Sequence, residues 1–174
     1  MDDDCAVLRR DFLPADLVPW ISDRGFDGTI AVQAREMEVE TSFLLDLADQ
    51  NPWILGVVGW LDLLDPSVEE RIERFAARPR LKGLRMLIHD QPDRWFAISP
   101  GHVRGVSLLE RYGLAYDLLL KPPHLEPATR LVDRFPNQRF VVDHLAKPAI
   151  ATETHSPWRE DLRELARRPN VFCK

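Results

Sequence analysis

Several features that mark common protein classes are missing from this 174-residue sequence. It has no basic stripe, because its 23 lysines and arginines are interspersed among 28 acidic residues, so a nucleic-acid partner has little support. No apolar run approaches the roughly 20 residues that cross a bilayer. The acidic start, MDDDC, also lacks the positive charge of a secretory signal. The sequence therefore predicts a globular protein with no nucleic-acid or membrane partner.

Cysteine and glycine are scarce as well. The two cysteines, Cys5 and Cys173, lie near opposite ends with no metal-type or disulfide spacing, which favours a cytoplasmic location. The segment REMEVE, which follows the first strand-like run, contains no glycine, so a dinucleotide-binding turn is disfavoured. No G-x-S-x-G pattern offers a serine nucleophile. Dinucleotide chemistry and serine-hydrolase chemistry are therefore both disfavoured.

Short apolar runs alternate with helical patterns along the whole chain. Most of the runs are continuously apolar, as in strands that are covered on both faces. They span residues 28–33, 54–60, 81–87, 114–120, 139–145 and 170–174. Asp65-Pro66, Ser99-Pro100 and Ser156-Pro157 each place a capping oxygen before a proline, which predicts three helix starts. Because strand starts recur roughly every 24–33 residues, the pattern predicts repeated strand–helix units.

The repeated units predict a single α/β domain over residues 1–174. Polar residues at or near the strand ends, Gln33, Asp62, Arg85, Asp117 and His144, favour a (β/α)₈ barrel, whose catalytic face lies at those ends. A whole barrel has eight strands and about 250 residues. With about six strand–helix units, the chain is expected to be an incomplete barrel. Its two open sheet edges would invite self-association.

Eight stretches of the sequence resemble the amidohydrolase-related (amidohydrolase 2) family. The resemblance is to its lactonase branch, that of L-fuconolactonase and 2-pyrone-4,6-dicarboxylate lactonase. The stretches are LRRDFLPADL (8–17), DGTIAVQAR (27–35), ILGVVGWLDL (54–63), LKGLR (81–85), QPD (91–93), GLAYDLLL (113–120), RFVVDHLAKP (139–148) and NVFCK (170–174). The resemblance implies a distorted (β/α)₈ barrel that hydrolyses a cyclic ester or a related carboxylated substrate.

The sequence also departs from that family. The family's first strand ends in His-x-His, a motif absent here, and its catalytic aspartate follows the last strand, beyond Lys174. Met86 stands where the family often has a histidine after the arginine of its fourth strand. The chain is therefore expected to be truncated at both ends.

The resemblance assigns a role to His144. As a residue of the barrel face it would polarise the substrate carbonyl, or help to bind a metal. The alternative is a hydrogen-bonded structural histidine that closes the strand. A divalent metal such as zinc is conceivable in the complete fold. Catalytic zinc usually has three protein ligands, however, and His144 is the one credible ligand in this sequence.

Four further residues are candidate substrate contacts. The guanidinium of Arg85 suits a carboxylate, and its alternative role is a salt bridge to a neighbouring loop. Gln33 and Asp117 are expected either to hydrogen-bond the substrate or to form a polar network, and Lys147 either to contact an anion or to be solvated. His102, His124 and His155 are expected to be exposed residues at helix entries.

Three functions follow from these observations. The first is a lactonase-like amidohydrolase, in which water attacks the ring carbonyl of a small carboxylated substrate. The second is a non-catalytic fragment, or a partial barrel that needs a second chain. The third is a metal-dependent decarboxylase of the same superfamily.

Overall fold

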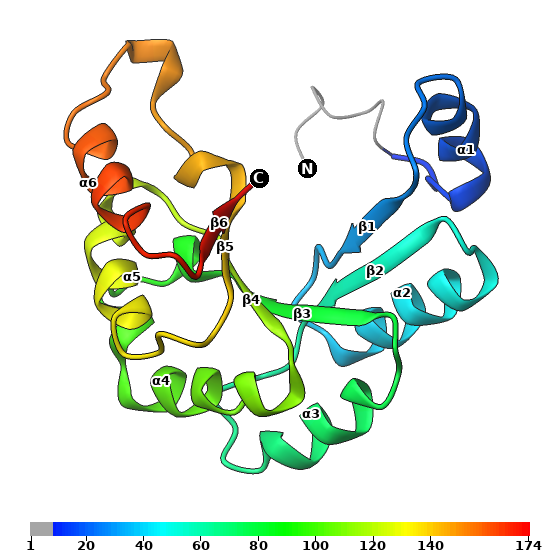
Figure 1. Cartoon of the computed structure of the whole chain (residues 1–174), viewed down its shortest axis with the longest axis horizontal. Helices are drawn as coiled ribbons and strands as arrows, with labels where there is room; N and C mark the ends of the chain where they lie inside the picture. The colour runs from blue at the N-terminus through cyan, green and yellow to red at the C-terminus, as the bar shows by residue number, and fades with distance from the viewer. Residues whose placement is uncertain (1–8) are drawn as a thin grey trace.

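A computed structural model describes residues 9–174 and shows one curved, six-stranded parallel sheet (Figure 1). The strands lie in chain order, and each pairs with the next. They are β1 (Thr29–Val32), β2 (Ile54–Gly59), β3 (Leu81–Met86), β4 (Ala115–Leu118), β5 (Phe140–Val142) and β6 (Val171–Cys173). All six predicted strands are confirmed, each shorter than its apolar run, and the predicted strand over residues 139–145 gives way to a 3-10 turn at Asp143–Ala146.

The α-helices lie along the outer side of this arc of strands (Figure 1). They are α1 (Pro14–Ser22), α2 (Glu38–Gln50), α3 (Val68–Ala76), α4 (Pro100–Ser107), α5 (Leu125–Val132) and α6 (Trp158–Leu165). A parallel sheet in sequential order with helices on one side is the arrangement of a (β/α)₈ barrel. The described residues therefore form part of such a barrel, as predicted. None of the helices within residues 9–174 is long and apolar enough to span a membrane.

The hydrophobic core lies between the strands and the helices. Val57, Ile72, Leu84 and Phe140 are at most 1% exposed. Gly105 of α4 packs so closely on the backbone of Leu63 that a side chain there would collide with it. This close packing holds α4 against the loop that follows β2.

The helix starts agree only in part with the proline pattern. Ser99 precedes Pro100 at the start of α4, as predicted. The Asp65-Pro66 prediction is wrong, because α3 begins at Val68 and the Oδ1 atom of Asp65 accepts a hydrogen bond from the Ser67 backbone at 2.7 Å. The Ser156-Pro157 prediction is also wrong by one residue, since Pro157 itself is the cap of α6. Aspartate and serine favour local turns as readily as helix caps, which explains the first error.

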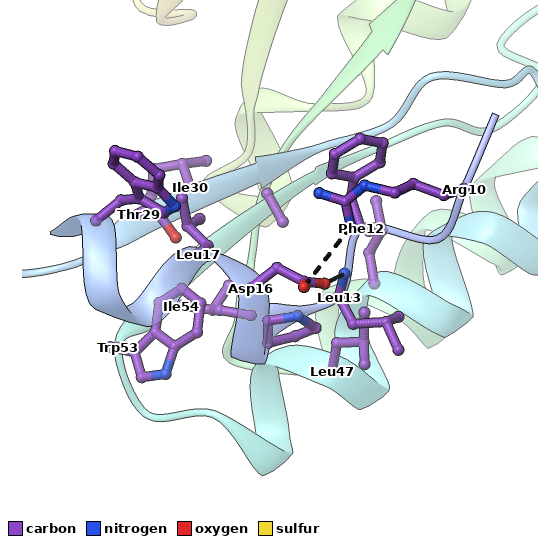
Figure 2. A pocket seen from close by; sticks show the side chains of 14 residues that line it. Arg10, Phe12, Leu13, Asp16, Leu17, Thr29, Ile30, Leu47, Trp53 and Ile54 are labelled. Atoms are coloured by element: carbon purple, nitrogen blue, oxygen red, sulfur yellow. Dashed lines mark hydrogen bonds and ion pairs between the residues drawn. The ribbon is translucent and has the colours of Figure 1, made fainter. Parts of the chain in front are cut away.

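Among the described residues, strand β1 forms one free edge of the sheet, and β6 forms the other. The Ile30 side chain of β1 is 49% exposed, and the described residues place no strand on the outer edge of β1. Beside it, α1, β1 and α2 line a groove of about 550 Å³ with apolar side chains such as Leu17, Leu47 and Trp53 (Figure 2). Arg10 and Asp16, 3.7 Å apart, are the charged pair at its border. No predicted site residue lines this groove.

Candidate functional site

Five polar side chains meet at the carboxyl ends of the strands. Arg85 and Asp117 occupy paired register positions on β3 and β4. Gln33, Asp143 and Lys174 directly follow β1, β5 and β6. Because all six strands are parallel, these ends share one rim of the sheet, where (β/α)₈ enzymes carry their catalytic residues.

Arg85 links β1 to β5 across this rim. Its Nη1 atom donates to Oδ2 of Asp143 at 2.7 Å, and its Nη2 atom donates to Oε1 of Gln33 at 2.9 Å and to the Gln33 carbonyl. The Gln33 amide returns a 3.4 Å hydrogen bond to the Arg85 carbonyl. All three residues are buried. The Nε atom of Arg85 is buried without a hydrogen-bond partner among the described residues, so it is a donor that the guanidinium can still offer.

Lys174 extends this network to β4. Its ammonium lies 2.6 Å from Oδ2 of Asp117 and 3.1 Å from Oδ1 of Asp143. Arg85, Asp143, Lys174 and Asp117 thus form a row of alternating charge, which we call the charged quartet. Two cations balance two carboxylates that are no more than 2% exposed, and such pairing is what permits buried charge.

Burial and pairing act in opposite directions on the protons of the quartet. Burial raises the pKa of the Asp117 carboxyl, against the opposing effect of its hydrogen bond with Lys174. Partial burial lowers the pKa of the Lys174 ammonium, but its contacts with Asp117 and Asp143 outweigh that effect, so the pKa is raised overall. Lys174 is the more exposed member of this pair, with a side chain that is 38% exposed against 2% for Asp117.

The structure brings Gln33, Arg85 and Asp117 together, but it places the other two predicted residues differently. His144 immediately follows Asp143, yet its side chain is exposed and has no hydrogen-bond partner within residues 9–174. Lys147 contacts His89 instead of the charged quartet, with 3.4 Å between the lysine Nζ and the histidine Nε2 atoms. His144 therefore faces solvent beside the network and takes no part in it.

Sequence reasoning missed Lys174 and misplaced two histidines. NVFCK was recognised as a strand, and Lys174 at its end occupies the same kind of position that singled out Arg85. His102 and His124 were predicted to be exposed, which is wrong, since they are 0% and 6% exposed. The Nδ1 atom of His102 donates to the Ala97 carbonyl at 2.8 Å, and Nε2 of the neutral ring accepts from the hydroxyl of Tyr116 at 2.6 Å. Those partners make its burial tolerable.

The residues present do not supply a metal site by themselves. No group of three histidine, cysteine, aspartate or glutamate side chains in residues 9–174 is arranged to hold a metal ion. The two carboxylates of the charged quartet, Asp117 and Asp143, are already neutralised by Lys174 and Arg85. A metal at this rim would need ligands in addition to His144, and it would compete with two resident cations.

Comparison with known proteins agrees with this geometry. The family model described as amidohydrolase matches residues 2–174. An L-fucono-1,5-lactonase of Burkholderia multivorans is 37% identical over 174 residues, and that of Burkholderia ambifaria is 34% identical over 168. Each alignment covers 97% of this chain and 58% of the relative. The chain thus spans less than two thirds of the length of these curated relatives.

Solved structures match the same fold. A zinc-bound amidohydrolase from Burkholderia multivorans superposes with a TM-score of 0.91 at 37% identity, over 99% of this chain and 61% of that one. A probable 2-pyrone-4,6-dicarboxylic acid hydrolase from Acinetobacter baumannii, at 13% identity and a TM-score of 0.75, covers 95% of this chain and 62% of that one. At that identity the second match supports the fold alone.

Proposed function

The chain belongs to the amidohydrolase family, and on that premise we propose that it carries part of the active site of a hydrolase that opens a lactone ring. The observation that supports this most directly is the charged quartet, buried at the carboxyl rim where barrel enzymes place their chemistry. The names of its relatives support a sugar lactone as the substrate class. A zinc ion bound to one related structure is a property of that protein.

In the proposed reaction, water attacks the ring carbonyl carbon and the bond between that carbon and the ring oxygen breaks. The ring oxygen takes up a proton that originates from the water and leaves as a hydroxyl group. His144 is the catalytic residue and the candidate metal ligand of this chain. Its exposed imidazole donates a hydrogen bond to the carbonyl oxygen as negative charge develops there. The general base that activates the water is expected outside residues 1–174, since the family's aspartate follows a later strand.

The charged quartet prepares the rim for this step. Arg85 holds Asp143, the residue before His144, and so fixes the point from which the imidazole projects. The free Nε donor of Arg85 is the proposed anchor for a substrate oxygen. Gln33, Asp117 and Lys147 are the other proposed substrate contacts. Gln33 and Asp117 act from inside the network, and Lys147 acts from the loop after β5.

A chimera tests the proposal. The 174 residues are joined to the remaining segments of the Burkholderia multivorans lactonase, and hydrolysis of L-fucono-1,5-lactone is measured with and without added zinc. We expect His144→Ala to lower kcat by about 100-fold or more, the usual loss when one oxyanion donor is removed. Lys82→Ala, at the opposite end of β3 from the quartet, is the control and should keep full activity. A chimera whose turnover is unchanged by His144→Ala would remove the proposed role.

The free β1 edge supports a second candidate, in which the chain works as a partial barrel paired with another copy of itself. An exposed apolar strand edge is a template for pairing with a second chain, and Ile30, Leu17 and Trp20 are all at least 41% exposed beside it. Light scattering on the 174-residue chain tests this. A dimer that Ile30→Lys converts to a monomer is the expected result, and a monomeric parent chain would contradict it.

A cytoplasmic location, which would keep Cys5 and Cys173 reduced, remains part of the proposal.

A further inference from the structure

A second charged group lies on the same rim, in the loops that follow β3, β4 and β5. His89 and Asp90 come from the first loop, Lys121 from the second and Lys147 from the third. Oδ1 of Asp90 lies 3.2 Å from Nε2 of His89 and 3.5 Å from Nζ of Lys121. Nζ of Lys147 lies 3.4 Å from the same histidine nitrogen, and Lys121 donates to the His89 carbonyl at 3.3 Å. We call these four residues the basic rim cluster.

The positive charge of the basic rim cluster exceeds its negative charge. Burial, and then the neighbouring Lys147, lower the pKa of the His89 ring, so the ring is neutral near pH 7. That leaves two ammonium groups facing the single carboxylate of Asp90. Lys147 has no carboxylate within ion-pair distance in residues 9–174, in contrast with Lys174, which touches two. One positive charge is therefore left for an anion from outside.

The His89 ring also has an unfilled position. Its Nδ1 atom is buried and has no hydrogen-bond partner within the described part of the chain. Buried polar atoms in proteins are nearly always paired, with the protein itself, with water or with a ligand. The orphaned nitrogen and the unbalanced lysine belong to the same few residues, and both indicate that a polar partner is missing from the cluster.

A strained turn holds Lys147 in this position. His144, Leu145, Ala146 and Lys147 all have positive φ angles between 50° and 56°, although none is glycine. Such a backbone costs about 1–2 kcal/mol per residue, and strain of this kind persists where the surroundings enforce it, often at functional sites. Here the indole Nε1 atom of Trp158 donates to the Leu145 carbonyl at 2.7 Å. The same turn therefore aims Lys147 at His89 and carries His144.

We propose that the basic rim cluster is a subsite for the carboxylate of a polyhydroxy acid, and that Asp90 is the resident anion which that carboxylate replaces. The inference rests on the proposed function in one respect, since opening a sugar lactone produces such an acid. Asp90 is 58% exposed, so its side chain can turn out to solvent. The incoming carboxylate then accepts hydrogen bonds from the ammonium groups of Lys121 and Lys147.

Direct binding tests the subsite without any need for turnover. Gluconate, a polyhydroxy carboxylate, and gluconamide, its uncharged counterpart, are titrated separately into the 174-residue chain and followed by calorimetry. Gluconate is expected to bind about tenfold more tightly than gluconamide, as loss of one charge-assisted hydrogen bond would cause. Equal affinities, or no measurable gluconate binding, would overturn the proposal.

Variants then identify the contacts. Lys121→Met and Lys147→Met should each weaken gluconate binding about tenfold, whereas Lys82→Met, a lysine hydrogen-bonded to Pro79 at the other end of β3, should leave it unchanged. Asp90→Asn should tighten binding severalfold, because it removes the competing anion. An Asp90→Asn variant that binds gluconate more weakly would show that Asp90 only braces the lysines, and the proposal would fall. The two proposals can fail separately. If gluconate binds with these variant effects but the chimera does not hydrolyse the lactone, the subsite stands and the proposed function is rejected.

Discussion

The centre of the sheet and its β1 edge use similar sequences in different surroundings. In β3, Leu84 is 1% exposed, and the charge of the next residue, Arg85, is paired within the buried quartet. In β1, Ile30 is 49% exposed although its run, GTIAVQ, is just as apolar. The difference lies in what covers each strand, because within residues 9–174 β3 has neighbours on both sides and β1 pairs with β2 alone. Stability should therefore depend strongly on the centre and weakly on the edge.

The largest effect is expected from the charged quartet. Asp143→Asn removes one carboxylate and leaves Arg85 and Lys174 to share Asp117, so unfolding free energy should fall by about 3–5 kcal/mol, as when a buried ion pair loses one partner. Urea unfolding at pH 7 measures the loss. Asp133→Asn is the matched control, since Asp133 forms a comparable pair with Arg168 at 2.8 Å but is 49% exposed. That exposed pair should contribute no more than about 1 kcal/mol.

Equal losses in the two aspartate variants would break the comparison. They would mean that water reaches the quartet as freely as it reaches the surface, so burial would not distinguish the two ion pairs. A double variant, Arg85→Met with Asp143→Leu, sharpens the result. It should recover part of the stability lost in Asp143→Asn, because replacing both charges leaves neither one buried without a partner.

A smaller effect on the unfolding free energy is expected from His102, which is buried as a neutral ring. Burial lowers its pKa from 6.5 to about 4, against the opposing hydrogen bond to the Ala97 carbonyl. The folded state thus resists protonation that the unfolded state accepts. The stability that the neutral, buried His102 ring contributes to the folded state is fully present above pH 6.5 and is lost as the pH falls towards 4. From the difference in pKa, the loss across that window should be about 3 kcal/mol.

Two variants separate burial from hydrogen bonding at this site. His102→Gln should remove the extra fall in unfolding free energy between pH 6.5 and about 4. Tyr116→Phe removes the hydroxyl that lies 2.6 Å from the ring but keeps the site dry, so the pH dependence should persist. If Tyr116→Phe abolished that dependence, the hydroxyl would be its cause and the assignment to burial would be wrong.

The strands were predictable because apolar runs record burial along the chain, whereas two of the three helix starts predicted from prolines were wrong. RFVVDHL and LKGLRML predicted β5 and β3, and the polar residue ending each run identified the rim that holds Arg85 and Asp143. The pattern gave no information about pairing across strands. Lys174 joins Asp117 over 57 positions of sequence, and His102 is buried because Tyr116, from another element, donates to its ring. Such contacts depend on the tertiary arrangement, which a single sequence does not state.

The smallest effect is expected at the β1 edge, where two isoleucines on adjacent strands form a matched pair. Ile54 of β2 is 4% exposed, whereas Ile30 of β1 is 49% exposed. Ile54→Ala should lower the unfolding free energy by about 2–5 kcal/mol, the usual cost of a buried truncation. Ile30→Ala should cost about 1 kcal/mol, since only half of its side chain leaves water on folding. If a second copy covers the β1 edge, the Ile30→Ala loss should grow with protein concentration while the Ile54→Ala loss stays constant. Losses of equal size at all concentrations would show that the two strands are equally covered, and the contrast between edge and centre would be wrong.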